Sequence, residues 1–435
     1  MPFFHRLLDS AVANTKLVHA WSSTLASRPR GGTGTRANRH ILLFAWEFPP
    51  SISGGVYRAA ALARYAGRAG WQVTVISGPA TEQPSRAGIS LLDYAGDAVR
   101  NVRVPSPSLR PSYKLFPQVD GNLLSGIEMF GLARRELAKS RPSVVVATGP
   151  PFHDFIAGYF SSKWAGASLI LDYRDEWTQC PFDFVAKGGA NAVWERRCLS
   201  AADHVIFTTD SQRKRLNRLY GVGLTAKSEV IPNGWEPGDF EGSPLNPENR
   251  ETWPLTLMFA GKLGGHTDPQ RFLAALTRLL ERKPEWRDQL RVRLVGPKLD
   301  SVAALLAQFP YPQVLQDVPL VPREEAAALM KSADALLLFH DARFERYLPG
   351  KLFEYMAAHK PILVVDDIGE TRRLVESLEA GCAIDSSDID ALEAVFAQLA
   401  TRTLWSRNEK RDEWLSRHTR ERLTGRFLTL FDRAQ

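Results

Sequence analysis

The sequence predicts an α/β protein of two successive domains, each built on a parallel sheet covered by helices. The 435 residues are too many for one compact core and fit two domains of ~200 residues. From Ile41 onward, short apolar runs of strand length alternate with helical patterns, as in βαβ units. Residues 236–253 carry no apolar periodicity and the alternation restarts after them, so this stretch is the predicted linker.

The first domain is predicted to span residues 40–235. Its strands are the short apolar runs Ile41–Ala45, Gln72–Ile76, Val144–Thr148, Leu169–Tyr173, Val205–Thr208 and Glu229–Pro232. Helical patterns cover Gly55–Arg68, Asp154–Ala165 and Asp210–Tyr220. Residues 80–120 are rich in Pro, Ser and Gly and are predicted to be irregular.

The second domain is predicted to span residues 254–404. Its predicted strands are Leu255–Ala260, Val292–Val295, Ala335–Phe339 and Pro361–Val365. Its predicted helices are Pro269–Lys283, Ser301–Gln308, Glu324–Ser332, Lys351–Ala358, Thr371–Ala380 and Asp388–Ala400. Residues 405–435 mix aromatics and arginines at helical spacing and predict a C-terminal amphipathic helix.

Composition excludes several classes of protein. With 44% hydrophobic and 24% charged residues, the chain is neither collagen-like, nor a coiled coil, nor fully disordered. No window reaches the ~18 uninterrupted apolar residues of a membrane span. Cys180, Cys198 and Cys382 lie far apart without a C-x-x-C pair, so we expect a reducing compartment and no zinc knuckle or disulfide scaffold.

The net charge of +7 is concentrated at the two ends of the chain. Residues 1–40 hold six basic residues against one acid, residues 401–435 hold nine against five, and the middle is slightly acidic. This distribution disfavours a nucleic-acid-binding core, where basic residues gather on a folded face. It leaves open an attraction of the two basic ends to an anionic membrane surface. We expect a cytoplasmic protein, with association to a membrane through these ends as the open alternative.

Residues 1–39 are predicted to be a flexible basic extension. Apolar positions in residues 1–27 have loose helical spacing, and residues 28–36 have the composition of a linker. An interfacial amphipathic helix and a transit peptide are the alternatives, whereas a cleavable signal peptide fits poorly because charges interrupt the apolar run.

Glycines and a lysine follow the first strand of each domain, where ligands of open α/β sheets bind. Gly54 and Gly55 open a helix, so backbone amides there could approach a phosphate. Neither G-x-G-x-x-G nor a P-loop is present, which disfavours a nicotinamide dehydrogenase and a P-loop enzyme. In the second domain Lys262 follows Gly261 and could neutralise a diphosphate. The alternatives are an ordinary loop and an exposed lysine.

The segment Tyr347–Ala358 is the most informative. Pro349 and Gly350 end a loop, and Lys351 begins a helix whose free N–H groups predict a phosphate site. Glu354 lies one turn into this helix, where a carboxylate could bind a ribose diol. Stabilisation of the helix dipole is the alternative role for Glu354.

Over residues 40–430 the chain resembles the GT-B glycosyltransferases, specifically the family-4-like retaining enzymes. The motifs that carry the resemblance are Pro49–Gly55, Asp172–Trp177, Ala201–Ile206, Ile231–Gly234, Phe259–Lys262, Leu320–Ala326 and Gly350–Met356. The resemblance implies two Rossmann-like domains that face each other across a cleft, the first for the acceptor and the second for the donor. It also implies that the last helix crosses back to the first domain.

The resemblance implies a nucleoside-diphosphate sugar as co-substrate, without metal or cofactor. The implied donor-binding residues are Gly54, Gly55, Lys262, Arg346, Pro349, Gly350, Lys351 and Glu354, and Asn233 and Gly234 would shape the interdomain loop. Two features depart from the family pattern. Arg346 stands eight positions before Glu354, where the family often has a glutamate, and the second lysine that many members carry after Lys262 is absent. The phosphate charge would then be met by fewer cations, or by Arg346 or Arg343.

Catalysis in such enzymes resembles front-face displacement with retention, helped mainly by stabilisation of the leaving group. The resemblance implies three catalytic residues. Lys262 would stabilise the leaving group, and His153 and Asp175 would be assisting groups. The implied acceptor-side residues are Asp172, Arg174 and Trp177. The alternatives are a loop role for His153, internal salt bridges of Arg174 with Asp172 and Asp175, and a packing role for Trp177.

Two acidic pairs are expected to be structural. Asp388 and Asp390 spell a D-x-D sequence but open a helix, where aspartate is a cap. Asp366 and Asp367 are expected to form a turn.

The sequence thus predicts transfer of a sugar to a hydroxyl acceptor, a glycan or lipid-linked saccharide. The alternatives are an epimerase-like nucleotide-sugar enzyme and a non-catalytic sugar-nucleotide-binding protein.

Overall fold

A computed structural model of the chain describes residues 39–79, 84–105, 119–138, 140–241, 254–366, 368–401 and 408–433, together with His19 and Ser22. The described residues form two compact units. Unit 1 contains the residues up to Pro232 and those from Glu421 onward, and unit 2 contains Asn233–Arg420. The expected extension over residues 1–39 lies almost entirely outside the described residues, as does most of the expected linker.

Unit 1 is built on a seven-stranded sheet with the order β3-β2-β1-β4-β5-β6-β7, in which every described pairing is parallel. The strands are β1 His40–Phe44, β2 Gln72–Ser77, β3 Val99–Arg103, β4 Val144–Gly149, β5 Ser168–Tyr173, β6 His204–Phe207 and β7 Ser228–Val230. The order reverses between β1 and β4, which makes the gap between these two strands the topological switch point of the sheet.

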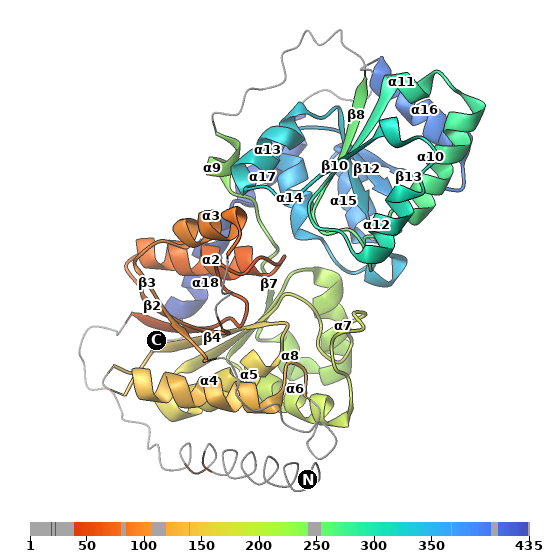
Figure 1. Cartoon of the computed structure of the whole chain (residues 1–435). Helices are drawn as coiled ribbons and strands as arrows, with labels where there is room; N and C mark the ends of the chain where they lie inside the picture. Colours follow the sequence, from red (N-terminus) through yellow and green to blue (C-terminus); the bar gives the residue numbers. More distant parts are fainter. Residues whose placement is uncertain are drawn as a thin grey trace, which may run out of the picture. The chain divides into compact units, whose positions relative to one another are not determined.

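Helices cover both faces of this sheet (Figure 1). One face packs against α2 Val56–Arg68, α3 Arg86–Ala95 and α18 Arg420–Arg433, and the other against α4 Leu123–Glu136, α5 His153–Ala165 and α6 Gly189–Ala201. Helices α7 Asp210–Tyr220 and α8 Val222–Thr225 precede β7. On α18, Phe427 and Phe431 belong to the same buried cluster as α2, and the Phe431 ring lies 5.5 Å from that of Trp71.

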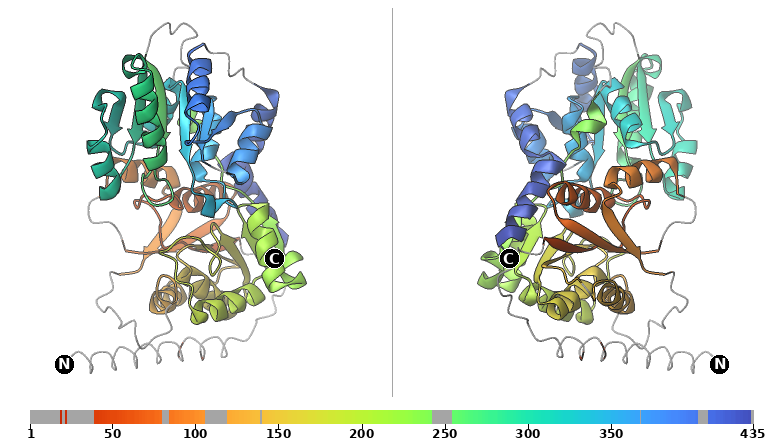
Figure 2. Two further views of the ribbon diagram at one scale, coloured as in Figure 1. Left: turned by 90° about the vertical axis from the view of Figure 1, so that its right-hand side faces the viewer. Right: turned by 90° about the vertical axis from the view of Figure 1, so that its left-hand side faces the viewer.

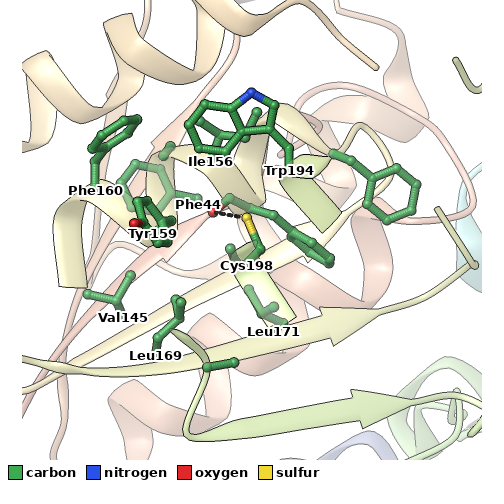
Figure 3. Close-up of a cluster of buried hydrophobic side chains, with 14 of the residues drawn as sticks. Phe44, Val145, Ile156, Tyr159, Phe160, Leu169, Leu171, Trp194 and Cys198 are labelled. Carbon is green, nitrogen blue, oxygen red and sulfur yellow. Dashed lines mark hydrogen bonds between the residues drawn. The ribbon is translucent and has the colours of Figure 1, made fainter. Parts of the chain in front are cut away.

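Helix α5 is buried on nearly all sides because it lies between the sheet and its neighbours α4 and α6. Figure 3 shows Ile156 and Phe160 of α5 among Leu169, Leu171 and Trp194. Cys198 of α6 donates a weak hydrogen bond to the Phe155 carbonyl at 3.6 Å. Burial raises the pKa of this thiol, so Cys198 serves as a small apolar residue.

Unit 2 repeats the plan with a six-stranded parallel sheet in the order β10-β9-β8-β11-β12-β13. The strands are β8 Leu255–Ala260, β9 Leu290–Val295, β10 Leu315–Val318, β11 Ala335–Phe339, β12 Ile362–Val365 and β13 Gly381–Ile384. Its switch point lies between β8 and β11.

Helices again lie on both faces of this sheet (Figures 1 and 2). One face carries α10 Gln270–Arg282, α11 Trp286–Gln289, α12 Asp300–Ala307 and α16 Ile389–Ala400. The other carries α9 Pro237–Phe240, α13 Arg323–Ser332, α14 Gly350–Ala357, α15 Glu370–Ser377 and α17 Glu409–Arg417. Two 3₁₀ turns, η1 Pro312–Val314 and η2 Ala342–Phe344, complete the unit.

The predicted fold class, two Rossmann-like domains with parallel sheets, is confirmed, and all ten predicted strands exist. The prediction that residues 80–120 are irregular was wrong, because they contain α3 and β3. Strands β10 and β13 and helices α4 and α6 were also missed. All three missed strands lie at sheet edges, where half-exposed strands lack a long apolar run. The expected single C-terminal helix is two helices, α17 and α18.

The sequence predicts no segment that spans a membrane. Within the described ranges, no helix combines the length and the apolar character needed to cross a bilayer.

One arginine ties several elements of unit 1 together. The Arg58 guanidinium on α2 donates to both carboxylate oxygens of Asp172 at the end of β5, at 2.8–3.1 Å. It also donates to the carbonyls of Ile231 and Pro232 at 2.8 and 2.6 Å, and it lies 5.1 Å from the Phe427 ring of α18. Both charged side chains are buried, with 9% and 2% of their surface exposed.

We expect Asp172→Asn to lower the free energy of unfolding of unit 1 by about 3–5 kcal/mol, because a buried guanidinium then loses its counter-charge. The matched control is Asp210→Asn, which removes an ion pair whose carboxylate side chain is 42% exposed and should cost less than ~1 kcal/mol. Urea denaturation followed by circular dichroism measures both. Equal, small losses would show that the Arg58–Asp172 pair does not stabilise the unit.

Candidate functional site

The carboxyl ends of the strands beside each switch point are where open α/β sheets bind ligands. In unit 1 these are the residues after β1 and β4, and in unit 2 the residues after β8 and β11.

In unit 1 the switch point brings Trp46 to the start of α5. The Trp46 amide donates to Asp154 Oδ2 at 2.8 Å, and the Trp46 ring meets the His153 ring edge-on at 4.6 Å. His153 Nε2 lies 3.4 Å from Asp154 Oδ1, and both residues are buried. Burial lowers the pKa of His153 to about 3 and raises that of Asp154 well above its usual value. The imidazole is therefore neutral in this arrangement.

Gly121 closes over His153. Its φ of +72° is in the left-handed region, and a Cβ there would lie 1.9 Å from His153 Nδ1. His153 follows β4, at the predicted end of the sheet, but only 1% of its surface is exposed. Its assisting role in catalysis stays a prediction, and contact with a substrate requires that Gly121 or Trp46 move.

Gly55 and Arg174, which were expected to serve the donor and the acceptor separately, are neighbours. A Cβ at Gly55 would lie 1.4 Å from Nη1 of Arg174, so only glycine allows this approach. The Arg174 side chain donates to the carbonyls of Gly149 and Pro150. Gly54 borders open space. The N-terminus of α2 and a guanidinium thus lie together at this edge, an arrangement that favours an anion.

Asp172 and Trp177 are both buried and packed against neighbouring side chains, and the acceptor-side role expected for them stays a prediction. Asp172 is 1% exposed and is bound by Arg58 and by the Thr148 hydroxyl, which donates to Oδ2 at 2.9 Å. Its partner is therefore Arg58, and the expected bridge from Asp172 to Arg174 is wrong. Trp177 has no exposed surface, donates from Nε1 to Asn191 Oδ1 at 2.9 Å and stacks on Phe152 at 5.0 Å.

Asp175 differs from Asp172 because it is only half-buried. Burial raises the pKa of its carboxyl to about 6, and the neighbouring Arg174 charge opposes this rise. A carboxyl that titrates near neutrality is suited to general acid–base chemistry, so the geometry is compatible with the assisting role expected for Asp175.

In unit 2 the switch point brings Lys351 of α14 against the backbone that follows β8. Gly261 has a φ of +132°, and a Cβ there would lie 2.9 Å from Lys351 Nζ. The ammonium lies 3.9 Å from the centre of the Phe259 ring. Burial lowers the pKa of Lys351 to about 7, and Glu354 opposes this shift. Lys262, the next residue after Gly261, is exposed.

A histidine that sequence reasoning missed lies in the same loop. Burial, with the charge of Lys351 as the next largest cause, lowers the pKa of His266 to about 4. The His266 carbonyl accepts from the Asp341 amide at 3.2 Å, which joins the loops after β8 and β11. No motif marks His266, since its position depends on the glycine turns before it.

Helix α14 is fixed to β8 by a buried side chain. The Ala260 amide donates to the Tyr355 hydroxyl at 2.8 Å, and Tyr355 is fully buried. Pro349 is the N-cap and Gly350 the first residue of the helix, and the first amides of a helix have no acceptor within it. Glu354 follows one turn later, and its Oε1 accepts from Arg420 Nη2 at 3.1 Å.

The segment before α14 holds the two arginines expected to replace the missing cation. Arg343 pairs with Asp341 at 2.9 Å, and Arg346 Nη1 lies 3.9 Å from Glu345 Oε1. The Glu345 carbonyl accepts from the Glu370 amide at 2.8 Å. A donor-binding role for Arg346 stays a prediction.

Three of the four aspartates in the two acidic pairs are described, and each of the three has a structural partner. Asp388 caps α16 by accepting from the Ala391 amide at 2.9 Å, and Asp390 pairs with Arg282 at 2.6 Å. Asp366 accepts from the amide and hydroxyl of Ser386 at 2.8 and 2.6 Å. Asp367 lies outside the described residues.

The structure therefore brings most expected residues together in two groups. Unit 2 gathers residues that were expected to bind the donor at one edge of its sheet: Lys262, Pro349, Gly350, Lys351 and Glu354. Unit 1 gathers Gly55, Arg174 and the start of α5 at its own switch point. Arg58 and Arg420 were missed because both are helical arginines without a local sequence signal.

Comparison with known proteins finds one family match in each unit. Residues 53–234 match the glycosyl transferase 4-like domain family, and residues 254–402 match the family glycosyl transferases group 1. A D-inositol 3-phosphate glycosyltransferase from Kribbella flavida is 26% identical over 45% of this chain and 51% of its own length. A glycogen synthase from Mycobacterium tuberculosis is 24% identical over 81% of this chain and 84% of its own.

Solved structures share the fold. A glycosyltransferase from Rickettsia africae ESF-5 superposes with a TM-score of 0.64 at 15% identity, over 92% of this chain and 99% of that one. The chain spans only 51% and 36% of the length of the first two curated relatives. The two family matches cover most of both units, and the chain belongs to the family-4-like glycosyltransferases with the GT-B fold.

Proposed function

We propose that this protein transfers a sugar from a nucleoside-diphosphate sugar to a hydroxyl acceptor, with retention at the anomeric carbon. The observation that carries the proposal is the ammonium of Lys351 held against Gly261 at the start of α14. A cation, free helix amides and a glycine backbone at a switch point form a seat for a diphosphate.

In this proposal unit 2 binds the donor. Lys262 and Lys351 supply positive charge, and the amides at Gly350 and Lys351 donate to phosphate oxygens. Glu354, one turn further along α14, accepts hydrogen bonds from the ribose hydroxyls. Arg346 supplements the charge in place of the second lysine that many relatives carry.

The chemical step in this proposal depends on the departing diphosphate. Negative charge grows on its oxygens as the glycosidic bond breaks, and preorganised cations and amides stabilise that charge. The acceptor hydroxyl attacks from the same face, and the departing phosphate takes its proton. Asp175 and His153 of unit 1 are the assisting groups, and no metal or cofactor is required in this scheme.

The acceptor in this proposal is a glycan or a lipid-linked saccharide bound by unit 1. The two curated relatives described above carry different names, one an inositol phosphate enzyme and the other a glycogen synthase, so they support no single acceptor. The basic ends of the chain favour an acceptor at an anionic membrane surface.

A non-catalytic nucleotide-sugar-binding protein is the second candidate. The specific observation in its favour is Arg346, which stands where relatives have a glutamate that contacts the donor sugar. Such a protein would bind donor without breaking it, whereas a transferase also hydrolyses its donor slowly when no acceptor is present.

A thermal-shift panel of UDP, GDP, ADP, CMP and dTDP tests the proposal most simply. We expect one nucleoside diphosphate to raise Tm, since a ligand at 100 times its Kd stabilises by about 2.7 kcal/mol. The matching sugar donors are then assayed for hydrolysis. Lack of stabilisation by every member of the panel would contradict the proposed function.

We expect Lys262→Ala and Glu354→Gln each to lower donor turnover by at least ~10-fold, because a charge-assisted hydrogen bond contributes about 1.5–3 kcal/mol. The matched control is Lys283→Ala, which removes a half-exposed lysine paired with Glu393 on the surface of unit 2. Steady-state kinetics with the donor identified above measures all three variants. Wild-type kinetics for both site variants would exclude this site.

Nucleotide affinity should depend on the protonation of Lys351. The pKa of Lys351 is about 7 in the free protein, and a bound diphosphate would raise it. Well below pH 7 the ammonium is charged in both states, so Lys351 adds no pH dependence to the affinity. Above pH 7 binding must take up a proton, so Kd should rise by up to ~10-fold per pH unit.

Isothermal titration calorimetry between pH 6 and 9 measures this dependence. His266 does not contribute there, because its pKa of about 4 leaves it neutral throughout. Lys351→Gln should bind weakly with little dependence on pH. A Kd that stays constant or falls from pH 7 to 9 in the wild type would contradict the prediction.

A further inference from the structure

We infer that Arg420 is a positioning residue that sets the orientation of Glu354 and thereby the recognition of the donor ribose. The inference deepens the proposed function and rests on it. Its starting point is the 3.1 Å hydrogen bond from Arg420 Nη2 to Glu354 Oε1 within unit 2.

This hydrogen bond occupies one oxygen of the Glu354 carboxylate and leaves the other oxygen available to a ligand. The Arg420 side chain is 7% exposed, whereas that of Glu354 is 25% exposed. Within the described ranges, Oε2 of Glu354 has no hydrogen bond, so this oxygen can accept from a diol. A glutamate side chain has three rotatable bonds, and an ion pair on one oxygen restricts the direction of the other.

The backbone holds Arg420 in place. Its amide donates to the Trp235 carbonyl at 2.9 Å, and the Trp235 amide donates to the His418 carbonyl at 3.1 Å. The Trp235 indole also donates to the Leu415 carbonyl at 2.9 Å. The two chain segments thus pair as a short parallel bridge beside α17. These bonds fix the backbone of Arg420, and its buried guanidinium, whose side chain is 7% exposed, can then act as a reference point for the carboxylate of Glu354.

A second carboxylate balances the charge of Arg420. Asp239 Oδ2 lies 3.8 Å from Arg420 Nη1, while Asp239 Oδ1 lies 3.3 Å from Arg323 Nη2. Arg323 therefore shares Asp239 with Arg420, and no ion pair between Arg323 and Glu354 is described. Arg323 thus provides a matched control. Arg323→Gln disturbs the same buried ion pairs around Asp239, but it leaves the hydrogen bond between Arg420 and Glu354 in place.

Helix α18 continues the chain from Arg420 into unit 1. Arg420 is the first residue of α18 and the last residue of unit 2, and the rest of the helix belongs to unit 1. The bond to Glu354 thus joins the donor-binding helix directly to the segment through which the chain returns to unit 1.

The test measures ribose recognition rather than stability. Kd is determined by calorimetry for the ribonucleoside diphosphate that stabilises the wild type best and for its 2′-deoxy analogue. The wild type should prefer the ribonucleotide by ~10-fold, the effect of losing one hydrogen bond to a charged acceptor. Arg420→Gln should reduce this preference to less than ~3-fold, and Arg420→Lys should restore part of it.

Two further variants separate positioning from a general structural effect. Arg323→Gln should keep the wild-type preference for ribose, even where its Tm falls as far as that of Arg420→Gln. In a Glu354→Gln background, Arg420→Gln should cause no further loss of preference, because the two residues act as one unit.

Three outcomes overturn the inference. An unchanged ribose preference in Arg420→Gln overturns it alone, and so does an equal loss of preference in Arg323→Gln. A wild type that binds no nucleoside diphosphate overturns the proposed function and this inference with it.

Discussion

The approach of the Lys351 ammonium to the backbone of Gly261 is the contact on which the proposed donor site depends. It requires a residue without a Cβ at a φ of +132°, directly after the first strand of the sheet. It also requires that α14 begin at this edge, which the buried Tyr355 secures through its hydrogen bond to Ala260. Because the ammonium is desolvated over the Phe259 ring, its pKa is about 7 and it responds strongly to an anion.

Unit 1 differs from unit 2 in the electrostatics of its strand ends. Its charged residues near the strand ends are mostly neutralised or paired, as with Asp172 and Arg58. His153 is buried and neutral because its pKa is about 3, and burial raises the pKa of Asp154 well above its usual value. Arg174, which lies beside Gly55, and Asp175 are ionisable groups at this edge that are only half-buried. Recognition of a neutral sugar hydroxyl needs fewer charges than recognition of a diphosphate, which agrees with the proposed division of roles.

The sequence predicted the fold well because buried parallel strands are continuous apolar runs. It failed at β3, β10 and β13, which are edge strands with mixed composition. Among the site residues, glycines and the start of α14 were predictable since both follow strands at a switch point. The burial of Trp177 and the partner of Asp172 were not, because they depend on α6 and α2 packing from distant parts of the chain. Arg420 lies 66 residues from Glu354, and no local pattern connects them.

Hydrogen–deuterium exchange with and without the stabilising nucleoside diphosphate tests the central claim most directly. A diphosphate seated on Lys351 and the start of α14 should slow exchange at the amides of residues 350–353 and 261–263. Protection confined to other segments, or none at either segment in a complex that calorimetry shows to be saturated, would contradict the account.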